Sequence, residues 1–282
     1  MAIFEATKKF LLDHQHIAKV QVVSLGCGSD SLFWRLCADT DVDSRSSYFA
    51  FVEIDFPDSA ARKAERIRQD ALLSASVGSL ETGTDPWEGE ILHSDRYILM
   101  GCDIRDTGSL MTRISRVTKR RLPTMVISEC VLCYLEPRTT DMLTSKLVSH
   151  FDDLSWISYD PVGSEDSFGR RMVENLAQRG CGLPGIHRDL QGCTRPFHNA
   201  GFCTVHVADM LTVYNMILDT NQRRRIERIE FLDELEEWNL VMKHYALLWA
   251  SNAPSPTPPF DFTKHRTESR ANISAPHHPY VR

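Results

Sequence analysis

The chain has 282 residues, with 32 Lys and Arg against 38 Asp and Glu, which gives a formal net charge of −6 at pH 7. This length buries a sizeable core without disulfides or a structural metal, and 42% hydrophobic with 25% charged residues is typical of an ordinary globular protein. The acidic balance disfavours a nucleic-acid-binding protein. Apolar stretches far shorter than about 20 residues exclude a membrane-spanning helix.

The two ends of the chain differ in character. Residues 1–16 mix charged with apolar side chains, so they contain no signal-peptide core, and a cytoplasmic location is expected. The last 32 residues hold six of the 13 prolines and almost no aliphatic side chains. We therefore predict a folded domain over residues 1–252 and a disordered, Pro-rich tail over residues 253–282.

Short β-rich segments alternate with longer helical patterns along the folded part. Strands are predicted at residues 20–25, 48–55, 96–102, 124–129, 154–159, 204–207 and 245–251. Helices are predicted at residues 31–38, 57–73, 137–150, 168–178 and 222–242, with polar loops at 39–47 and 74–89. The last of these helices carries an apolar stripe and is expected to pack on the sheet. The alternation predicts an α/β fold with a mostly parallel sheet and helices on both faces.

A glycine-containing turn joins the first strand to the first of these helices. Residues 26–30 read Gly-Cys-Gly-Ser-Asp. Glycines have no Cβ atom and let a ligand approach the backbone at a helix N-terminus. A dinucleotide-binding fingerprint would have a third glycine where this chain has Ser31, so the turn alone does not define a dinucleotide site.

Acidic residues follow at the ends of the next strands. Asp55 ends the second strand, where a carboxylate can accept both hydroxyls of a ribose. Asp103 follows the third strand, and Glu129 ends the fourth. The carboxyl ends of parallel strands form the ligand crevice of an open α/β sheet. These acids fit S-adenosylmethionine better than a nicotinamide cofactor, because this donor has ribose hydroxyls and an amino group but no pyrophosphate.

Each acid also has a structural interpretation. Asp55 could cap the following helix, Asp103 could cap a turn, and Glu129 could form a salt bridge at a strand end. Cys130 and Cys133 form a C-x-x-C without a second pair at zinc spacing. The Cys and His residues between 181 and 206 match no zinc template either, so no metal site is predicted.

Longer motifs occur in a fixed order over residues 10–252. They include Val-Val-Ser-Leu-Gly-Cys-Gly at 22–28, Phe-Trp-Arg-Leu at 33–36, Val-Glu-Ile-Asp-Phe-Pro at 52–57, Gly-Cys-Asp-Ile-Arg-Asp at 101–106, Glu-Cys-Val-Leu-Cys-Tyr at 129–134 and Ile-Glu-Phe-Leu-Asp-Glu at 229–234. In these motifs the chain resembles the leucine carboxyl methyltransferases, which esterify the C-terminal leucine of type 2A protein phosphatases.

The resemblance implies an S-adenosylmethionine-dependent O-methyltransferase of Rossmann-like fold that forms a methyl ester on that leucine's α-carboxyl group. The implied positions are Gly26 at the glycine turn, Asp55 at the ribose, Asp103 and the Ile104 backbone at the adenine, Glu129 near the methionine portion, and Tyr134 as the wall of the reaction site and the candidate catalytic residue. A packed aromatic is the alternative interpretation of Tyr134. The implied partner is the phosphatase catalytic subunit, with no nucleic acid or membrane, and a monomer is expected.

One departure from the family concerns the start of the chain. Family members carry an arginine-rich segment before the glycine strand that holds the donor's carboxylate, and nothing in residues 1–20 matches it. We therefore expect that the family's N-terminal segment is lacking. Two alternatives stay open. One is a weakened or non-catalytic member with an incomplete donor site. The other is a related methyltransferase for a small-molecule carboxylate or a modified tRNA base, although the acidic charge counts against tRNA.

Overall fold

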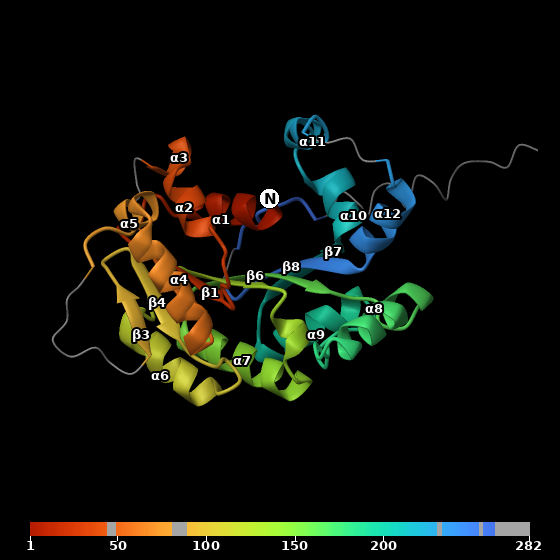
Figure 1. Ribbon diagram of the computed structural model, residues 1–282, viewed down its shortest axis with the longest axis horizontal. Coiled ribbons are helices and arrows are strands. Elements are labelled where there is room, and N and C mark those ends of the chain that lie inside the picture. The colour runs from red at the N-terminus through yellow and green to blue at the C-terminus, as the bar shows by residue number, and fades with distance from the viewer. Residues whose placement is uncertain (44–48, 81–88, 230–232, 254–255, 263–282) are drawn as a thin grey trace, which may run out of the picture.

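A single eight-stranded sheet organises the computed structural model, which describes residues 1–43, 49–80, 89–229, 233–253 and 256–262 (Figure 1). The strands are β1 (Val20–Leu25), β2 (Phe49–Asp55), β3 (Glu90–His93), β4 (Tyr97–Gly101), β5 (Thr124–Glu129), β6 (Leu154–Pro161), β7 (Thr204–Asp209) and β8 (Tyr245–Ser251). Their order is β3-β4-β2-β1-β5-β6-β8-β7. The five strands from β4 to β6 run parallel, whereas β3 and β8 are antiparallel to their neighbours. The predicted mostly parallel α/β sheet is confirmed.

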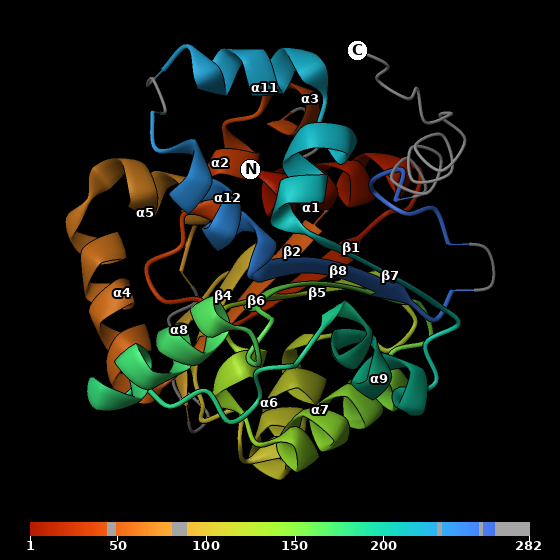
Figure 2. The same ribbon diagram turned by 90° about the vertical axis from the view of Figure 1, so that its right-hand side faces the viewer.

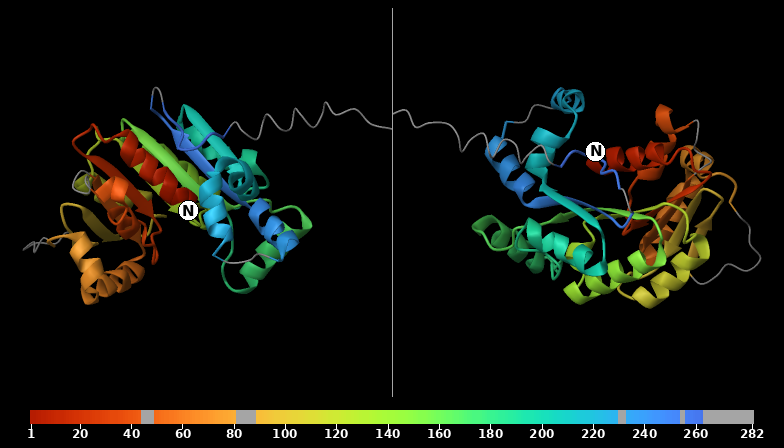
Figure 3. Two further views of the ribbon diagram at one scale, coloured as in Figure 1. Left: turned by 90° about the horizontal axis from the view of Figure 1, so that it is seen from above. Right: turned by 180° about the vertical axis from the view of Figure 1, so that it is seen from behind.

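Helices cover both faces of this sheet. They are α1 (Ala2–Asp13), α2 (Leu32–Cys37), α3 (Thr40–Asp43), α4 (Pro57–Gln69), α5 (Ala71–Val77), α6 (Thr107–Val117), α7 (Pro137–His150), α8 (Ser167–Gln178), α9 (Leu190–Ala200), α10 (Met210–Thr212), α11 (Thr220–Glu227) and α12 (Leu235–Lys243), with a 3₁₀ turn at Leu132–Tyr134 and a π-helical turn at Val213–Ile217. α1 and α2 lie on one face and α6, α7 and α9 on the other, as Figures 2 and 3 show from further sides.

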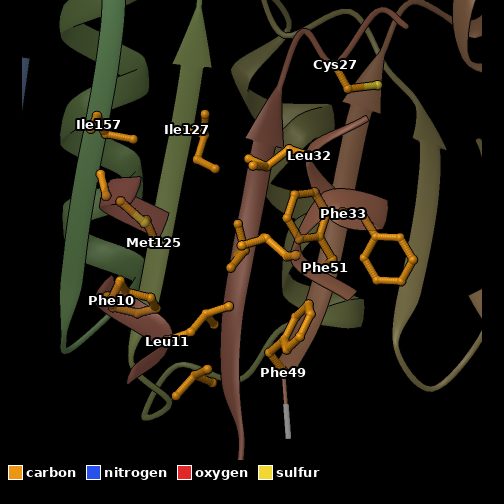
Figure 4. Close-up of a cluster of buried hydrophobic side chains, with 14 of the residues drawn as sticks. Phe10, Leu11, Cys27, Leu32, Phe33, Phe49, Phe51, Met125, Ile127 and Ile157 are labelled. Atoms are coloured by element: carbon orange, nitrogen blue, oxygen red, sulfur yellow. The ribbon is translucent and has the colours of Figure 1, made fainter. Parts of the chain in front are cut away.

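The core follows from the twofold alternation of side chains along the strands. In β1, Val20 and Val22 face the cluster that α1 and α2 cover, while Val23 and Leu25 face the cluster under α6 and α7. Figure 4 shows the first cluster, where Phe33 packs beside Phe51 with ring centroids 5.6 Å apart. β1 is thus buried on both faces, as is typical of a central strand in a parallel sheet that helices cover on both sides. The sheet extends from β1 in both directions.

Two predicted helices, over residues 57–73 and 222–242, are each divided into two shorter helices in the structure. The helix expected over residues 57–73 ends at Gln69, because Asp70 has extended backbone angles and its carboxylate accepts hydrogen bonds from the N–H groups of Leu72 and Leu73. Asp70 thereby caps a second helix, α5. The predicted loop over residues 39–47 likewise contains a helical turn, α3, and the loop over 74–89 begins inside α5.

The helix predicted over residues 222–242 is wrong as a single element. It forms α11 and α12, and residues 230–232 between them lie outside the described residues. Glu236 and Glu237 stand in the first turn of α12, where carboxylates stabilise a helix N-terminus and so favour a new start. Two residues of the apolar stripe do not pack on the sheet as expected, since Ile229 is 71% and Leu235 is 56% exposed.

The packed chain extends beyond the boundary predicted at residue 252. Phe262 is 3% exposed, belongs to the core cluster under α1 and stacks on His206 at a centroid distance of 5.3 Å. The remainder of the predicted tail, residues 263–282, lies outside the described residues. Across the part of the chain that the structure describes, we find no helix with the length and apolar character needed to cross a bilayer.

Candidate functional site

A cavity of about 270 Å³ lies at the carboxyl ends of β1, β2, β4 and β5. It is lined by Gly26, Asp55, Phe56, Cys102, Asp103, Ile104, Arg105, Cys130, Val131, Tyr134 and Leu135. We call it the nucleoside cavity. All the residues predicted from the sequence line it except Glu129, which lines a neighbouring cavity.

The glycine turn and Asp55 are held together across the end of the sheet. Gly26 has a φ of +67°, and a Cβ atom there would lie 2.4 Å from Val131 Cγ2, so this position requires glycine. One oxygen of Asp55 accepts a hydrogen bond from the Gly28 N–H at 2.7 Å, and the other accepts one from the Phe56 N–H at 2.8 Å. Phe56 occupies the N-cap of α4 with no side-chain cap bond. Asp55 therefore fixes the glycine turn and does not cap the helix.

A buried ion pair supports the same turn from within the fold. Lys63 on α4 donates a hydrogen bond to the Asp30 carbonyl at 2.8 Å and pairs with Glu53 of β2. The Tyr97 hydroxyl donates to the same Glu53 carboxylate at 2.5 Å. This network was not predicted from the sequence, although a glutamate inside an otherwise apolar strand was a usable signal.

Asp103 and Arg105 form a local pair at the rim of the cavity. The Arg105 N–H donates to Asp103 at 3.0 Å, and its guanidinium lies 2.6 Å from the carboxylate. These hydrogen bonds from Arg105 hold the pKa of Asp103 below its ordinary value. The alternative interpretation of Asp103 as a turn cap is thus correct in part, because Asp103 closes the turn that places Ile104 in the lining of the cavity.

The chain after β5 makes a sharp turn on the opposite wall. Cys130 has a φ of +52°, a left-handed conformation that is uncommon in a non-glycine residue, and its N–H donates to the Tyr159 carbonyl at 2.7 Å. The Asp160 carboxylate then accepts hydrogen bonds from the N–H groups of Val131 and Cys133. This turn brings Tyr134, which is 46% exposed, to the mouth of the cavity.

The C-x-x-C thiols are poorly suited to redox chemistry. Burial raises the pKa of Cys130 to about 11 and raises the pKa of Cys133 as well, so both are neutral thiols near pH 7. Within the described residues, no cluster of three or more His, Cys, Asp or Glu side chains is arranged to hold a metal ion.

A second cavity of about 330 Å³ adjoins the same strand end. It is lined by Met1, Ala2, Ile3, Phe4, Asp30, Leu32, Arg35, Glu129, Tyr159, Met210 and Leu247. Burial and the nearby Asp30 charge raise the pKa of Glu129. In the described part of the chain Glu129 forms no ion pair closer than 4.0 Å, so the predicted alternative of a salt-bridged strand end is not observed.

These features fit an adenosine-containing methyl donor. A carboxylate at the end of β2 can accept ribose hydroxyls, and a glycine turn without room for a Cβ atom allows close approach. Ile104 lines the cavity beside a second carboxylate, that of Asp103. With the mostly parallel sheet and its antiparallel β8, they define a methyltransferase of the S-adenosylmethionine-dependent fold class.

Comparisons with known proteins give the family. The model described as "Leucine carboxyl methyltransferase" matches residues 5–148. Leucine carboxyl methyltransferase 1 of Yarrowia lipolytica is 35% identical over 89% of this chain and 76% of its own length, and that of Bos taurus is 35% identical over 90% and 75%. The chain belongs to the leucine carboxyl methyltransferase family, and its methyl donor is S-adenosyl-L-methionine.

More distant similarities are also found. The human tRNA wybutosine-synthesizing protein 4 is 32% identical over 93% of this chain, which spans 38% of that protein. Among solved structures, geranyl diphosphate C-methyltransferase from Streptomyces coelicolor A3(2), in complex with Mg²⁺, geranyl diphosphate and S-adenosyl-L-homocysteine, aligns over 87% of this chain and 78% of that chain. Its TM-score is 0.47 and its sequence identity 14%.

Proposed function

We propose that this protein methylates the α-carboxyl group of the C-terminal leucine of type 2A protein phosphatase catalytic subunits. The observation that carries the proposal is the 35% identity to two leucine carboxyl methyltransferases over about nine tenths of this chain. The nucleoside cavity adds a donor site of suitable chemistry. Its mouth, at Tyr134, is where a peptide end could enter.

The proposed chemistry needs little from the protein beyond alignment. S-adenosylmethionine supplies a methyl group made electrophilic by its positively charged sulfur. A peptide carboxylate is already ionised at neutral pH, so no general base has to remove a proton. The residues of this chain act by holding the donor at Gly26 and Asp55 and by excluding water with the walls around Tyr134 and Leu135.

A transfer assay tests the acceptor directly. Purified phosphatase catalytic subunit is incubated with the enzyme and donor carrying a tritiated methyl group, and base-labile label is measured. We expect label on the intact subunit and none on a subunit that lacks its terminal leucine. Asp55→Ala should abolish transfer, whereas Asp58→Ala, which changes a neighbouring acid in the first turn of α4, should retain it. Absence of label with folded enzyme at saturating donor would exclude the proposed acceptor.

A tRNA acceptor is the second candidate, and the similarity to tRNA wybutosine-synthesizing protein 4 favours it. The net charge of −6 opposes it, because phosphate contacts with basic side chains supply most of the affinity for nucleic acid. The same tritium assay with a total tRNA pool distinguishes the two acceptors. We expect label on the phosphatase and background counts on the RNA.

A further inference from the structure

A further cavity of about 350 Å³ lies where α2, α4 and α5 come together beside the glycine turn (Figure 1). We call it the α4 cavity. Among the described residues, none from the end of β5 lines it, and it shares only Asp30 with the second cavity described above. It is lined by Gly28, Ser29, Asp30, Ser31, Trp34, Ser59, Arg62, Lys63, Arg66, Ile67 and Leu73. The α4 cavity therefore lies apart from the wall at Tyr134, and the donor chemistry assigns no ligand to it.

Two arginines of α4 line this cavity without a bound carboxylate. Arg62 and Arg66 are one helical turn apart, and both are exposed. In the part of the chain that the structure describes, neither forms an ion pair within 4.0 Å. This holds although Asp58 and Glu65 stand on the same helix. Two like charges at this spacing destabilise a helix, so an anion held between them would remove that repulsion.

The balance of charge in the lining is positive. Lys63 is the third cation, and its ammonium is already paired with Glu53. Asp30 is the one carboxylate among the described lining residues, and one of its oxygens accepts a hydrogen bond from the Leu32 N–H at 3.0 Å. The two unpaired guanidiniums outnumber this carboxylate, which favours an anionic ligand over a cationic one.

The donors around the two arginines suit a phosphate group. A guanidinium binds a phosphate through two parallel hydrogen bonds, and a phosphate monoester carries close to two negative charges at neutral pH. Ser59 accepts a hydrogen bond from Arg62 at 3.1 Å. The hydroxyls of Ser29 and Ser31 form none within the described residues and stay available as donors. A carboxylate has only two oxygens and one charge, so it would satisfy one guanidinium and leave the other unpaired.

An apolar wall completes the cavity. It consists of Trp34, Ile67 and Leu73. The indole N–H of Trp34 donates to the Leu73 carbonyl at 3.0 Å, which fixes the ring between α2 and α5. A ligand with an apolar body attached to its phosphate can bury that body against this wall while its charge meets the arginines.

We propose that the α4 cavity binds the phosphate group of a small phosphate monoester, held by the guanidiniums of Arg62 and Arg66, with the apolar part of the ligand against Trp34. This ligand is distinct from the methyl donor and from the proposed acceptor. It reaches the glycine turn at Gly28 and Asp30, so both it and the donor contact the same turn.

Calorimetric titration tests the proposal on protein whose donor site is first filled by saturating S-adenosylhomocysteine. The probes are phenyl phosphate, inorganic phosphate, which lacks the apolar ring, and benzoate, which carries a carboxylate on the same ring. We expect phenyl phosphate to bind with a Kd of about 1 mM or lower and benzoate at least about tenfold more weakly. Tighter binding of phenyl phosphate than of inorganic phosphate assigns the site to an ester, and the reverse order assigns it to the free ion.

Two variants of α4 test the residues. Arg62→Met and Arg66→Met should each weaken binding of phenyl phosphate about tenfold or more. Both should leave the affinity for S-adenosylhomocysteine unchanged, which shows that the fold and the donor site are intact. Arg66→Met is the safer of the two, because Arg66 forms no side-chain hydrogen bond in the described part of the chain. Arg171→Met, at an exposed arginine of α8, changes the net charge equally and should bind phenyl phosphate as the wild type does.

Four results would overturn the proposal. Benzoate binding as tightly as phenyl phosphate would show an unselective anion surface. Phenyl phosphate that binds only when S-adenosylhomocysteine is absent would belong to the donor site. Equal weakening by Arg171→Met would show a general effect of net charge, and unchanged affinity in both α4 variants would place the phosphate elsewhere. None of these results depends on the acceptor, which the tritium assay decides.

Discussion

The Lys63 ammonium lies 2.5 Å from the Glu53 carboxylate, and both side chains are shielded from solvent, at 7% and 0% exposure. The pair joins α4 to β2 directly beneath the glycine turn, whose Asp30 carbonyl also accepts a hydrogen bond from Lys63. Removing one partner of a buried ion pair leaves a desolvated charge, which costs more than removing both partners. The network therefore links the stability of the domain to the position of the donor-binding turn.

We expect Lys63→Met and Glu53→Gln each to lower the free energy of unfolding by about 3 kcal/mol or more. The double variant should lose clearly less than the sum of the two, because neither charge is then left alone. Urea unfolding of the four proteins measures the coupling. Additive losses would contradict a direct interaction. Lys63→Met should also weaken binding of S-adenosylhomocysteine, since the Asp30 carbonyl loses its partner.

Gly26→Ala should destabilise the protein more than Gly180→Ala does. Both glycines have positive φ, at +67° and +77°, so both alanines carry the cost of a left-handed backbone, roughly 1–2 kcal/mol. A Cβ atom on Gly26 would in addition meet Val131 Cγ2 at 2.4 Å, whereas nothing lies within 4 Å at Gly180. Thermal unfolding of both variants measures the difference. Recovery of stability and donor affinity in Gly26→Ala/Val131→Ala would identify the clash as the cause, and equal losses in the two single variants would rule it out.

Tyr134 is expected to act as a wall and not through its hydroxyl. The side chain is 46% exposed at the cavity mouth, and its hydroxyl makes no hydrogen bond within the described residues. Tyr134→Phe should therefore keep kcat/KM within about threefold, while Tyr134→Ala should reduce it by about tenfold or more through loss of alignment. Steady-state methyl transfer with a phosphatase substrate provides the comparison. A Tyr134→Phe variant as impaired as Tyr134→Ala would assign the hydroxyl a direct role.

Asp160 makes the stability of the domain depend on pH. Burial raises the pKa of its carboxyl group from 3.8 to about 6, although it accepts hydrogen bonds from Ser158, Cys133 and Val131. A folded-state pKa above the unfolded value means that the stabilisation is present at low pH and is lost as the pH rises through about 6. Ionisation of Asp160 should thus cost the folded state about 2 kcal/mol between pH 4 and pH 7.

The variant Asp160→Asn isolates this contribution, because an amide oxygen can still accept from the two backbone N–H groups and its NH₂ group can donate to Ser158. We measure the free energy of unfolding of Asp160→Asn relative to that of the wild type. We expect this difference to shift in favour of the variant as the pH rises from 4 to 7. Urea unfolding at several pH values checks the expected difference. An identical pH dependence in the two proteins would show that Asp160 does not titrate in this range.

Strand positions were predicted well from the sequence because each central strand has its own local signal. β1, β5 and β8 match their predicted bounds, since their hydrophobic runs are ended by a turn or a polar residue. β3 was missed because Glu90–His93 is short and is held by pairing with β4 and not by a periodic pattern. The division into α11 and α12 was missed because an apolar stripe gives no information on whether a partner surface exists to bury it.

The residues of the site that lie at strand ends were predictable from the sequence. Gly26, Asp55 and Asp103 follow directly from strands, so topology brings them to one cavity. α1 itself was absent from the predicted elements, since the charged residues of the first turns obscured its apolar face.

The position of β8 between β6 and β7 has a consequence for synthesis on the ribosome. The N-terminal part of the chain leaves the ribosome first. Strands β6 and β7 therefore both emerge before β8, the strand that separates them in the sheet. Until residues 245–251 emerge, each has an unpaired edge, and the two could pair wrongly with each other. Closure of the sheet is therefore a late event of translation, and a nascent chain stalled before Tyr245 would be exposed to chaperones and proteases with its fold incomplete.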